Sequence, residues 1–496
     1  MVDLWATQLF ELDWPAWLVT LLIIPDILIR LIALGWVPYR RKPAVGLGWL
    51  LAIFFIPYVG IIAFLIFGSS KLPAKRRKDQ QTINDLIKAQ TGAQAILGKS
   101  EHLTEPLRTS AQLNYSLGAL PMTHGNSFSL LPDNHEAIRL MAKEVEQAKK
   151  FVHVEFYIAA YDSTTAPFFD ALKEAAERGV HVRVLLDHIG CVGYPGYKEL
   201  VKLMDNSPID WRRSLPVRPW RLEYQRPDLR NHRKIVVIDG EVGFTGSLNA
   251  IDKTYNKRAN VRKGFKWKDL AIRCTGPVVN ELDAVFATDW YSETGDIISD
   301  ELQLTMDPPR EGGIMAQAVP SGPGFPLENN LRLFNHLVYN ANKRVVIVTP
   351  YFVPNESLKQ ALTTEAHSGV DVRIYVSEQG NHAVLQYAQE SFYEELMENG
   401  VKIFLYPKPT ILHSKFILVD DDVTVIGSSN MDERSFAMNM EISLLIVDEG
   451  VTSSLYDLEE EAYVPVVKEL NIEQWRKRSL KQKYLENVCR LTSSLL

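Results

Sequence analysis

The chain has 496 residues, enough for two domains or for one domain built from two similar halves. Its 54 Lys and Arg residues are outnumbered by 60 Asp and Glu residues, and a net charge of −6 argues against a general nucleic-acid binder, which usually carries a basic surplus. The three cysteines lie far apart and in no metal-binding spacing, so we expect reduced, structural thiols and no metal site.

The N-terminus is far more apolar than the rest of the chain. Residues 47–67 form an uncharged apolar run of 21 residues, about the length that crosses a hydrocarbon core of about 30 Å. Residues 16–36 form a second such run, in which Asp26 and Arg30 are four apart and can neutralise each other on a helix. The pattern predicts a transmembrane helical hairpin within residues 1–70, and the lack of a basic N-region or cleavage site argues against a signal peptide.

Basic residues around the two apolar runs predict their orientation. The larger cluster follows the second run, and a smaller one lies between the runs: Lys71, Lys75, Arg76, Arg77 and Lys78 against Arg40, Arg41 and Lys42. Because basic residues favour the cytoplasmic side, we expect a multi-pass protein of the inner (cytoplasmic) membrane. Its catalytic part would lie on the cytoplasmic face.

Beyond a linker at residues 71–120, with one helix at about 79–97, strands and helices alternate in the same order twice. In residues 121–305 we expect a helix at 136–149, a strand at 151–157, a helix ending near Gly179 and a strand at 180–186. In residues 306–496 the corresponding elements are a helix at 330–342, a strand at 345–351, a helix ending near Gly369 and a strand at 370–376. This alternation predicts an α/β fold whose sheets are covered on both faces.

Each half then carries the same short motif. His232-x-Lys234-x4-Asp239 is followed by Gly246-Ser247-x-Asn249, and His413-x-Lys415-x4-Asp420 is followed by Gly427-Ser428-x-Asn430. Six fixed identities at fixed spacing arise by chance with odds of about 10⁻⁸ per start position. Two copies therefore indicate a tandem duplication whose motifs meet at one shared site.

The residue types in the motifs fit phosphodiester chemistry. Residues two apart on a strand share a face, so each His points the same way as its Lys. One imidazole can attack phosphorus and the other can protonate the departing oxygen, while the Lys, Ser and Asn donors stabilise the equatorial oxygens; no metal or other cofactor is needed. Asp239 and Asp420 end their strands, either as turn residues or as groups that orient the Lys or His, and we include them in the catalytic set.

Two acidic residues are candidates to orient the histidines. Asp269 and Glu441 each open an apolar strand after their own motif, and a carboxylate can hold an imidazole through its second ring nitrogen. Asp269 comes 20 residues after Asn249, whereas Glu441 comes 11 residues after Asn430, so the intervals differ.

An arginine-rich run with interleaved tryptophans leads into the first motif. It contains Trp211, Arg212, Arg213, Arg218, Trp220, Arg221, Arg226 and Arg230. The run is either a solvated loop or an interfacial element, and we favour the second because Trp sits at the headgroup level and Arg attracts anionic lipid. The expected lipid contacts are Trp211, Arg218, Trp220 and Arg221.

The two motifs resemble those of the phospholipase D superfamily, and further segments resemble bacterial cardiolipin synthases. These segments are Trp49-Leu-Leu, Ile56-Pro-Tyr-Val-Gly60, Ser321-Gly-Pro-Gly-Phe-Pro326, Thr349-Pro-Tyr-Phe-Val-Pro354 and Asp432-x-Arg434-Ser435. The resemblance runs from about residue 20 to the C-terminus. It implies two tandem phospholipase D-like α/β/α sandwich halves that form one pseudo-two-fold catalytic unit after the hairpin.

The resemblance also implies a reaction. Two phosphatidylglycerol molecules would give cardiolipin and glycerol through a phosphatidyl-histidine on His232, with His413 as acid and then as base. A phospholipase D-type hydrolase, or a transferase using another acceptor such as phosphatidylethanolamine, would carry identical motifs. A membrane-tethered nuclease fits the acidic charge and the hairpin poorly, and a non-enzymatic scaffold would not need intact motifs. The oligomeric state and the acceptor lipid stay open.

Overall fold

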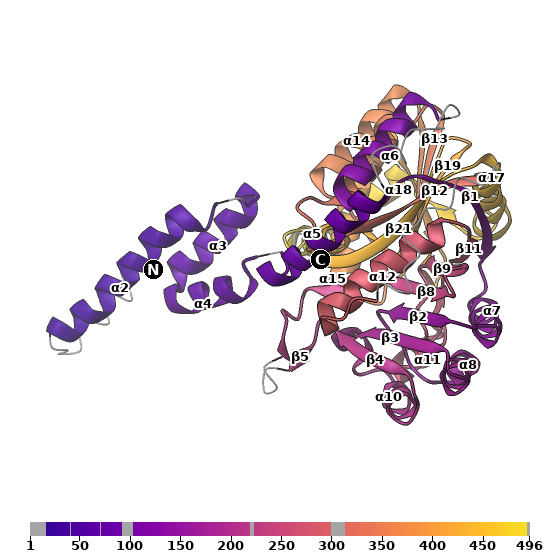
Figure 1. The fold of residues 1–496 in the computed structure, drawn as a ribbon. Helices are drawn as coiled ribbons and strands as arrows, with labels where there is room; N and C mark the ends of the chain where they lie inside the picture. The colour runs from indigo at the N-terminus through magenta and orange to yellow at the C-terminus, as the bar shows by residue number, and fades with distance from the viewer. Residues whose placement is uncertain are drawn as a thin grey trace. The chain divides into compact units, whose positions relative to one another are not determined.

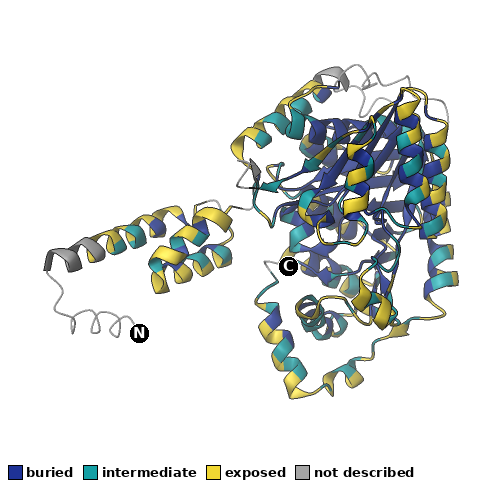
Figure 2. Ribbon diagram, turned by 90° about the horizontal axis from the view of Figure 1, so that it is seen from below, coloured by how far each residue is buried: buried dark blue, intermediate teal, exposed yellow. Residues whose placement is uncertain are grey.

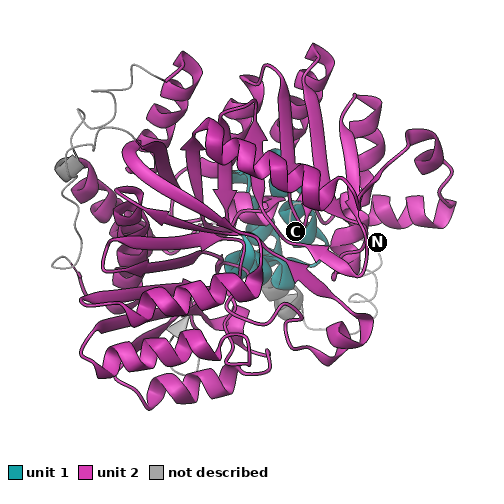
Figure 3. Cartoon of the chain, turned by 90° about the vertical axis from the view of Figure 1, so that its right-hand side faces the viewer, with its two compact units in different colours: residues 1–70 teal, residues 71–496 magenta. Residues whose placement is uncertain are grey.

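The computed structural model describes residues 16–39, 41–69, 71–91, 103–218, 223–298 and 313–493. It divides into two compact units, residues 1–70 and residues 71–496, which Figure 3 shows in different colours.

The described residues of unit 1 form the helices α2 (Ala16–Trp36), α3 (Pro43–Phe55) and α4 (Pro57–Phe67). Helix α2 matches the first predicted run, and Arg30 pairs with Asp26 at 2.9 Å as expected. The second run is not the single helix that we predicted. It breaks at Ile56, because Pro57 has no backbone N–H and disfavours helical backbone in the residue before it.

The break lets α4 fold back against α3. A Cβ atom on Gly60 would lie 2.6 Å from the carbonyl oxygen of Ala52, so only glycine permits this approach. A small core of Ala33, Val37, Ile53 and Phe64 lies inside the unit, while many large apolar side chains are exposed. Among the helices that the structure describes, none combines the length and the apolar character needed to cross a bilayer.

Unit 2 is built on one large mixed sheet of 16 strands (Figure 1). The strands of the first half are β1 (Thr123–Leu131), β2 (Phe151–Phe156), β3 (His181–Asp187), β4 (Asp210–Ser214), β7 (Arg230–Asn231), β8 (Lys234–Ile238), β9 (Val242–Gly246) and β11 (Ala271–Thr275). Those of the second half are β12 (Ile314–Ser321), β13 (Arg344–Val348), β15 (Asp371–Ser377), β16 (Lys402–Tyr406), β18 (Phe416–Val419), β19 (Val423–Gly427), β21 (Asn439–Val447) and the short edge strand β22 (Lys468–Glu469).

The order of the strands is the same in both halves. The order β4-β3-β2-β8-β9-β11-β1 in the first half recurs as β16-β15-β13-β18-β19-β21-β12 in the second. In each half the first three strands are parallel and the following ones antiparallel. The halves join where β1 pairs antiparallel with β12, so the sheet runs without interruption through the whole unit.

Helices cover both faces of the sheet (Figure 1). In the first half they are α7 (Asn134–Glu146), α8 (Ala166–Glu177), α10 (Tyr197–Asp205) and α12 (Val278–Thr294); in the second they are α13 (Asn329–Tyr339), α14 (Glu356–Ser368), α15 (Ala383–Glu398), α17 (Glu449–Leu458) and α19 (Leu480–Arg490). Local signals set several ends: Asp133 accepts a hydrogen bond from the N–H of Glu136 at the start of α7, and Gly369 ends α14 at φ +100°.

Central strands such as β2 and β8 are buried at every position, and Figure 2 shows the sheet in dark blue. Along β8, Val236 and Ile238 belong to the core of the first half, whereas Ile235 and Val237 belong to a core that also holds residues of the second half. This shared core fixes the two halves against each other. The segment that we expected as a linker is part of the body, because α5 (Ala74–Thr91) and α6 (Glu105–Gly118) bury Ile87 and Leu107 in these cores.

Candidate active site

Each motif histidine directly follows a short strand that pairs with a strand of the other half. Strand β7 (Arg230–Asn231) pairs with β21, and β17 (Thr410–Leu412) pairs with β10 (Lys266–Lys268). The next residue in each case continues the ladder: the N–H of His232 donates to the carbonyl of Met440 at 2.9 Å, and the N–H of His413 donates to that of Lys268 at 2.8 Å. Each His is therefore held beside the acidic residue of the opposite half.

The acidic residues pair with the histidines in a crossed pattern. Nδ1 of His232 lies 2.9 Å from a carboxylate oxygen of Glu441, and Nδ1 of His413 lies 2.6 Å from one of Asp269. The sequence named both acids as candidates without saying which His each would hold. The structure brings both to the site and pairs each with the His of the opposite half, because β7 and β17 run beside strands of the other half.

The motif serines hold these carboxylates. Ser247 Oγ donates to Asp269 at 2.7 Å, and Ser428 Oγ donates to Glu441. Each chain of contacts thus runs from a Ser through an acid of its own half to the His of the other half. With Nδ1 directed at a carboxylate, Nε2 is the nitrogen left for chemistry.

The two lysines lie with their histidines. Lys234 Nζ donates to the carbonyl of His232 at 2.6 Å, and Lys415 Nζ donates to that of His413 at 2.7 Å. Both side chains are almost completely buried. Each ammonium has three hydrogens and uses only one of them in this bond. The other hydrogens of both lysines remain available to donate to an anion in the site.

Burial sets the protonation of the histidines. It lowers the pKa of His232 to about 4, although the Glu441 carboxylate acts in the opposite direction. It likewise lowers the pKa of His413 to about 4, helped by the charge on Lys415. At neutral pH both imidazoles are therefore neutral, with a proton on Nδ1 and a lone pair on Nε2.

The same burial acts on the other charged groups. It lowers the pKa of Lys234 to about 7 and that of Lys415 to about 8. Burial alone would raise the pKa of Asp269 and Glu441, but the neighbouring His and Lys outweigh it, and both pKa values lie below the ordinary range. The site thus holds two carboxylates and two lysines. A bound anion can easily change the protonation of the lysines, because their pKa values lie close to neutral pH.

The two motif asparagines have different surroundings. Asn249 accepts from the N–H of Ile158 at 3.2 Å and donates to the hydroxyl of Tyr255 at 2.8 Å. Asn430 receives support through its backbone N–H, which donates to Ser435 at 3.1 Å. In the first half, the side chain of Asn249 therefore holds Tyr255 in place. The Tyr255 ring lies edge-on to that of His413, with ring centres 6.4 Å apart.

Asp239 and Asp420 require a correction. Asp239 accepts from the N–H groups of Lys149, Lys150 and Phe151 at 2.7 to 2.9 Å, at the end of β8 away from the lysine. Asp420 does the same for residues 342–344. Each Asp comes five positions after its Lys along the strand, a distance of about 16 Å. Both residues adopt positive φ, 54° and 52°, so they are turn residues that fix the preceding strand rather than catalytic groups.

A buried polar network behind His232 was missed by sequence reasoning. Arg233 donates to Asp289 and, at 3.1 Å, to the carbonyl of Glu441. Asn231 donates to Glu155, whose burial raises its pKa well above the usual range. The signal was a glutamate in the middle of an otherwise apolar strand, where an unpaired charge would be costly.

The arginine-rich run is held within the fold at several points. The indole N–H of Trp211 donates to Asp205 at 2.9 Å, and its ring packs against the core of the first half. Arg226 pairs with Asp228, and Arg230 with Asp187. Arg218 lies in the short strand β5 (Val217–Arg218), and Trp220 and Arg221 lie outside the described residues. These contacts argue against Trp211 as a lipid contact.

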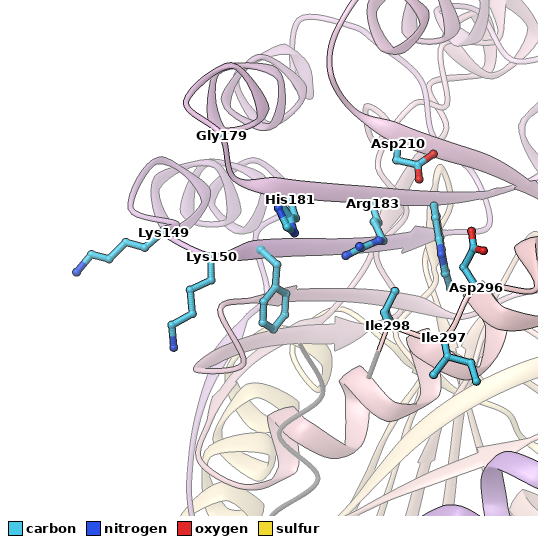
Figure 4. A pocket seen from close by; sticks show the side chains of 11 residues that line it. Lys149, Lys150, Gly179, His181, Arg183, Asp210, Asp296, Ile297 and Ile298 are labelled. Atoms are coloured by element: carbon cyan, nitrogen blue, oxygen red, sulfur yellow. The ribbon is translucent and has the colours of Figure 1, made fainter. Parts of the chain in front are cut away.

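A cavity of about 900 Å³ in the first half is separate from this site (Figure 4). Lys150, His181 and Asp210 line it at the beginnings of the parallel strands. Lys234 pairs with Phe156 at the far end of β2, so the cavity lies at the opposite end of the sheet from the catalytic groups.

Comparison with known proteins agrees with this geometry. A family model described as the cardiolipin synthase, phospholipase D-like domain matches residues 141–290 and 335–460. Cardiolipin synthase A of Serratia proteamaculans (strain 568) is 32% identical over an alignment of 480 positions that covers 92% of this chain and 94% of that protein. Cardiolipin synthase A of Yersinia pseudotuberculosis serotype O:1b (strain IP 31758) is 33% identical over 478 residues, with the same coverage.

A solved structure shares the fold. The phosphatidylserine synthase of Haemophilus influenzae Rd KW20 superposes with a TM-score of 0.54 at 17% identity, covering 79% of this chain and all of that one. The catalytic unit therefore has a mixed α/β, phospholipase D-like fold.

Proposed function

Because this chain belongs to the phospholipase D-like cardiolipin synthases, we propose that it is a phosphatidyltransferase that makes cardiolipin and glycerol from two phosphatidylglycerol molecules. The observation that carries the proposal is the crossed pair of His–carboxylate contacts, which places two histidines and two lysines in one buried site. That set can form and break a P–N bond at a phosphodiester without a nucleotide.

In the first step, Nε2 of His232 attacks the phosphorus of one phosphatidylglycerol. The bond from phosphorus to the terminal glycerol oxygen breaks, and His413 gives that oxygen a proton. The new imidazolium keeps its proton on Nδ1 and donates it in a hydrogen bond to the Glu441 carboxylate, whose negative charge stabilises the positive charge of the ring. Lys234 and Lys415 stabilise the charge on the equatorial oxygens.

The starting protonation follows from the charges in the site. His413 is neutral in the free protein but must carry a proton on Nε2 to act as an acid. A bound phosphodiester adds a negative charge beside it, which raises its pKa and favours uptake of that proton. His232 is nucleophilic as long as its imidazole stays neutral. We assign it the role of nucleophile by its resemblance to the phospholipase D superfamily.

In the second step, the terminal hydroxyl of another phosphatidylglycerol attacks the same phosphorus. His413, now neutral, takes the hydroxyl proton, the P–N bond breaks, and His232 leaves as a neutral imidazole. Water in place of the lipid hydroxyl would give phosphatidic acid instead. Burial of both histidines limits the access of water to the intermediate.

The test is product analysis with purified full-length protein and phosphatidylglycerol labelled in its phosphate. We expect labelled cardiolipin and an equal amount of free glycerol, with no added nucleotide. His232→Ala and His413→Ala should each abolish transfer while the far-ultraviolet circular dichroism stays that of the wild type. Phosphatidic acid as the main product, or substantial transfer by either variant, would refute the proposal.

We also propose that unit 1 attaches the enzyme to the inner membrane and that unit 2 lies on the cytoplasmic side. Support comes from the apolar side chains that unit 1 exposes, such as Leu31, Phe55 and Val59, each more than 60% exposed. The basic residues after α4 favour the cytoplasmic side.

An introduced cysteine tests the orientation. The native cysteines Cys191, Cys274 and Cys489 are buried, so Lys477→Cys, at an exposed position, would carry the accessible thiol. We expect a membrane-impermeant maleimide to label it only after the inner membrane is opened. Labelling in intact spheroplasts would place unit 2 outside.

A further inference from the structure

The segment 253–268 is strongly basic in an otherwise acidic protein. It contains seven Lys or Arg residues and no Asp or Glu. It comprises the short helix α11 (Arg258–Lys263) and strand β10, which lie immediately before Asp269. We use the name α11 patch for its exposed residues, which are Lys257, Arg258, Ala259, Val261, Arg262, Lys263 and Lys266.

The cations of the α11 patch are not neutralised by the protein. Within the described ranges, none of its five Lys and Arg residues forms an ion pair. Some exposed arginines elsewhere are paired, such as Arg476 with Glu398 and Arg212 with Asp210. A cluster of unpaired positive charge attracts an anionic partner over about one Debye length, roughly 10 Å at moderate salt.

Apolar and aromatic side chains accompany the charges. Val261 is 57% exposed in the middle of α11. Lys257 Nζ lies 4.1 Å from the centre of the half-exposed Tyr194 ring, and Phe265 and Trp267 are buried beneath the patch. Basic residues around an exposed aliphatic and a tyrosine match the chemistry of a lipid headgroup layer, which offers anionic phosphate above hydrocarbon.

The patch is joined directly to the catalytic site. Tyr194 contacts Tyr255 with ring centres 5.8 Å apart, and Tyr255 lies edge-on to His413. Strand β10 itself supplies the carbonyl of Lys268 that accepts from the N–H of His413. A surface that binds the α11 patch is therefore only a few side chains away from the catalytic histidine.

We propose that the α11 patch docks on the surface of an anionic phospholipid bilayer and holds the His413 side of the site at the headgroup layer. The inference rests on the proposed function, since the substrate it would gather is the anionic lipid itself. It assigns lipid contact to a surface other than the arginine-rich run around Arg218.

The test must report locally, because unit 1 is proposed to attach the full-length protein to membranes in any case. Full-length Val261→Cys carries a fluorophore at its one accessible thiol and is reconstituted in vesicles that contain a spin-labelled quencher lipid. In phosphatidylglycerol vesicles the quencher should reduce the fluorescence strongly; in phosphatidylcholine vesicles it should not. About 0.5 M salt should restore the fluorescence, because it shortens the Debye length to a few ångströms.

Two controls make the result specific. A label at Lys143→Cys, exposed on α7, should not be quenched in either vesicle. The double variant Arg258→Glu/Arg262→Glu should lose the quenching at position 261. The variant Lys143→Glu/Lys173→Glu, with the same change in net charge, should keep it. The proposal would be overturned by equal quenching at both labels or by no quenching at position 261. Self-quenching of the label without any quencher lipid would also overturn it, because it would indicate contact with a second copy of the chain.

Kinetics give an independent readout. On vesicles, Arg258→Glu/Arg262→Glu should raise the KM for phosphatidylglycerol at least about 30-fold, since each of the two basic residues near an anionic surface contributes about 1 kcal/mol. Lys143→Glu/Lys173→Glu should leave KM unchanged. A fall in kcat at constant KM would overturn the proposal. Absence of cardiolipin synthesis by the wild type would refute the proposed function instead, whatever the quenching shows.

Discussion

The crossed histidine–carboxylate pairs are the most informative contacts in the molecule at the scale of single residues. His232 depends on Glu441, which lies 209 residues away, and His413 depends on Asp269, 144 residues away. Each carboxylate is in turn held by the serine of its own motif. Neither half contains a complete set of groups, so each half supplies the orientation for the other's chemistry.

The crossed pairing predicts which residues couple energetically. Glu441→Gln and His232→Ala should be non-additive in kcat/KM, because the acid acts through that His. Glu441→Gln and Asp269→Asn should each lower kcat by about 10² to 10⁴, the usual range for a positioned acid–base group. A double-mutant cycle measures the coupling. Strong coupling of His232 to Asp269 with none to Glu441 would contradict the crossed arrangement.

Protonation of the buried histidines predicts acid sensitivity. Their folded pKa is about 4, whereas the unfolded value is about 6.5. Between these values the unfolded state binds more protons, so stability is present above pH 6.5 and is lost as the pH falls toward 4. We expect the melting temperature to drop across this window, and His413→Gln to flatten the drop. An identical slope in the variant and the wild type would contradict this account.

At the scale of elements, local patterns predicted most strands well. The strand predicted at 370–376 is found as β15, shifted by one residue, because alternating β-branched residues after a glycine leave few other choices. The break at Ile56 was not predicted, since an apolar run looks uniform and the effect of Pro57 depends on how α4 meets α3. The crossed pairing could not be predicted at all, because β7 and β17 are two or three residues long and find their partners only through the assembled sheet.

The two motif aspartates act on elements rather than on chemistry. Asp239→Asn keeps a side chain that tolerates positive φ but weakens three bonds to the backbone before β2. It should lower the free energy of unfolding by about 1 to 3 kcal/mol and leave kcat of the folded enzyme unchanged. Thermal unfolding beside steady-state kinetics measures both. A loss of kcat with full stability would return Asp239 to the catalytic set.

At the scale of the whole molecule, one chain contains one complete site. The shared core and the β1–β12 contact make residues 71–496 a single body, and both histidines of the site come from that body. The sequence repeat indicated a duplication, but the union of both halves in one continuous sheet emerged only from the pairing of β1 with β12.

Mixing inactive variants tests this organisation. Purified His232→Ala and His413→Ala proteins should remain inactive when combined, because neither chain contains both histidines and the site does not form between chains. Cardiolipin formation by the mixture is the measurement, with mixed wild-type and variant protein as the control for inhibition. Recovery of activity would show that the halves exchange between chains.

Detection of the covalent phosphatidyl-histidine is the most direct test of the proposed mechanism. His413→Ala is given phosphatidylglycerol labelled at phosphorus in which the terminal glycerol is replaced by p-nitrophenol, a leaving group that needs no proton. We expect a burst of about one p-nitrophenol per enzyme, with acid-labile, alkali-stable label on the peptide that contains His232. No burst and no label on His232, or label on His232→Ala protein instead, would contradict the mechanism.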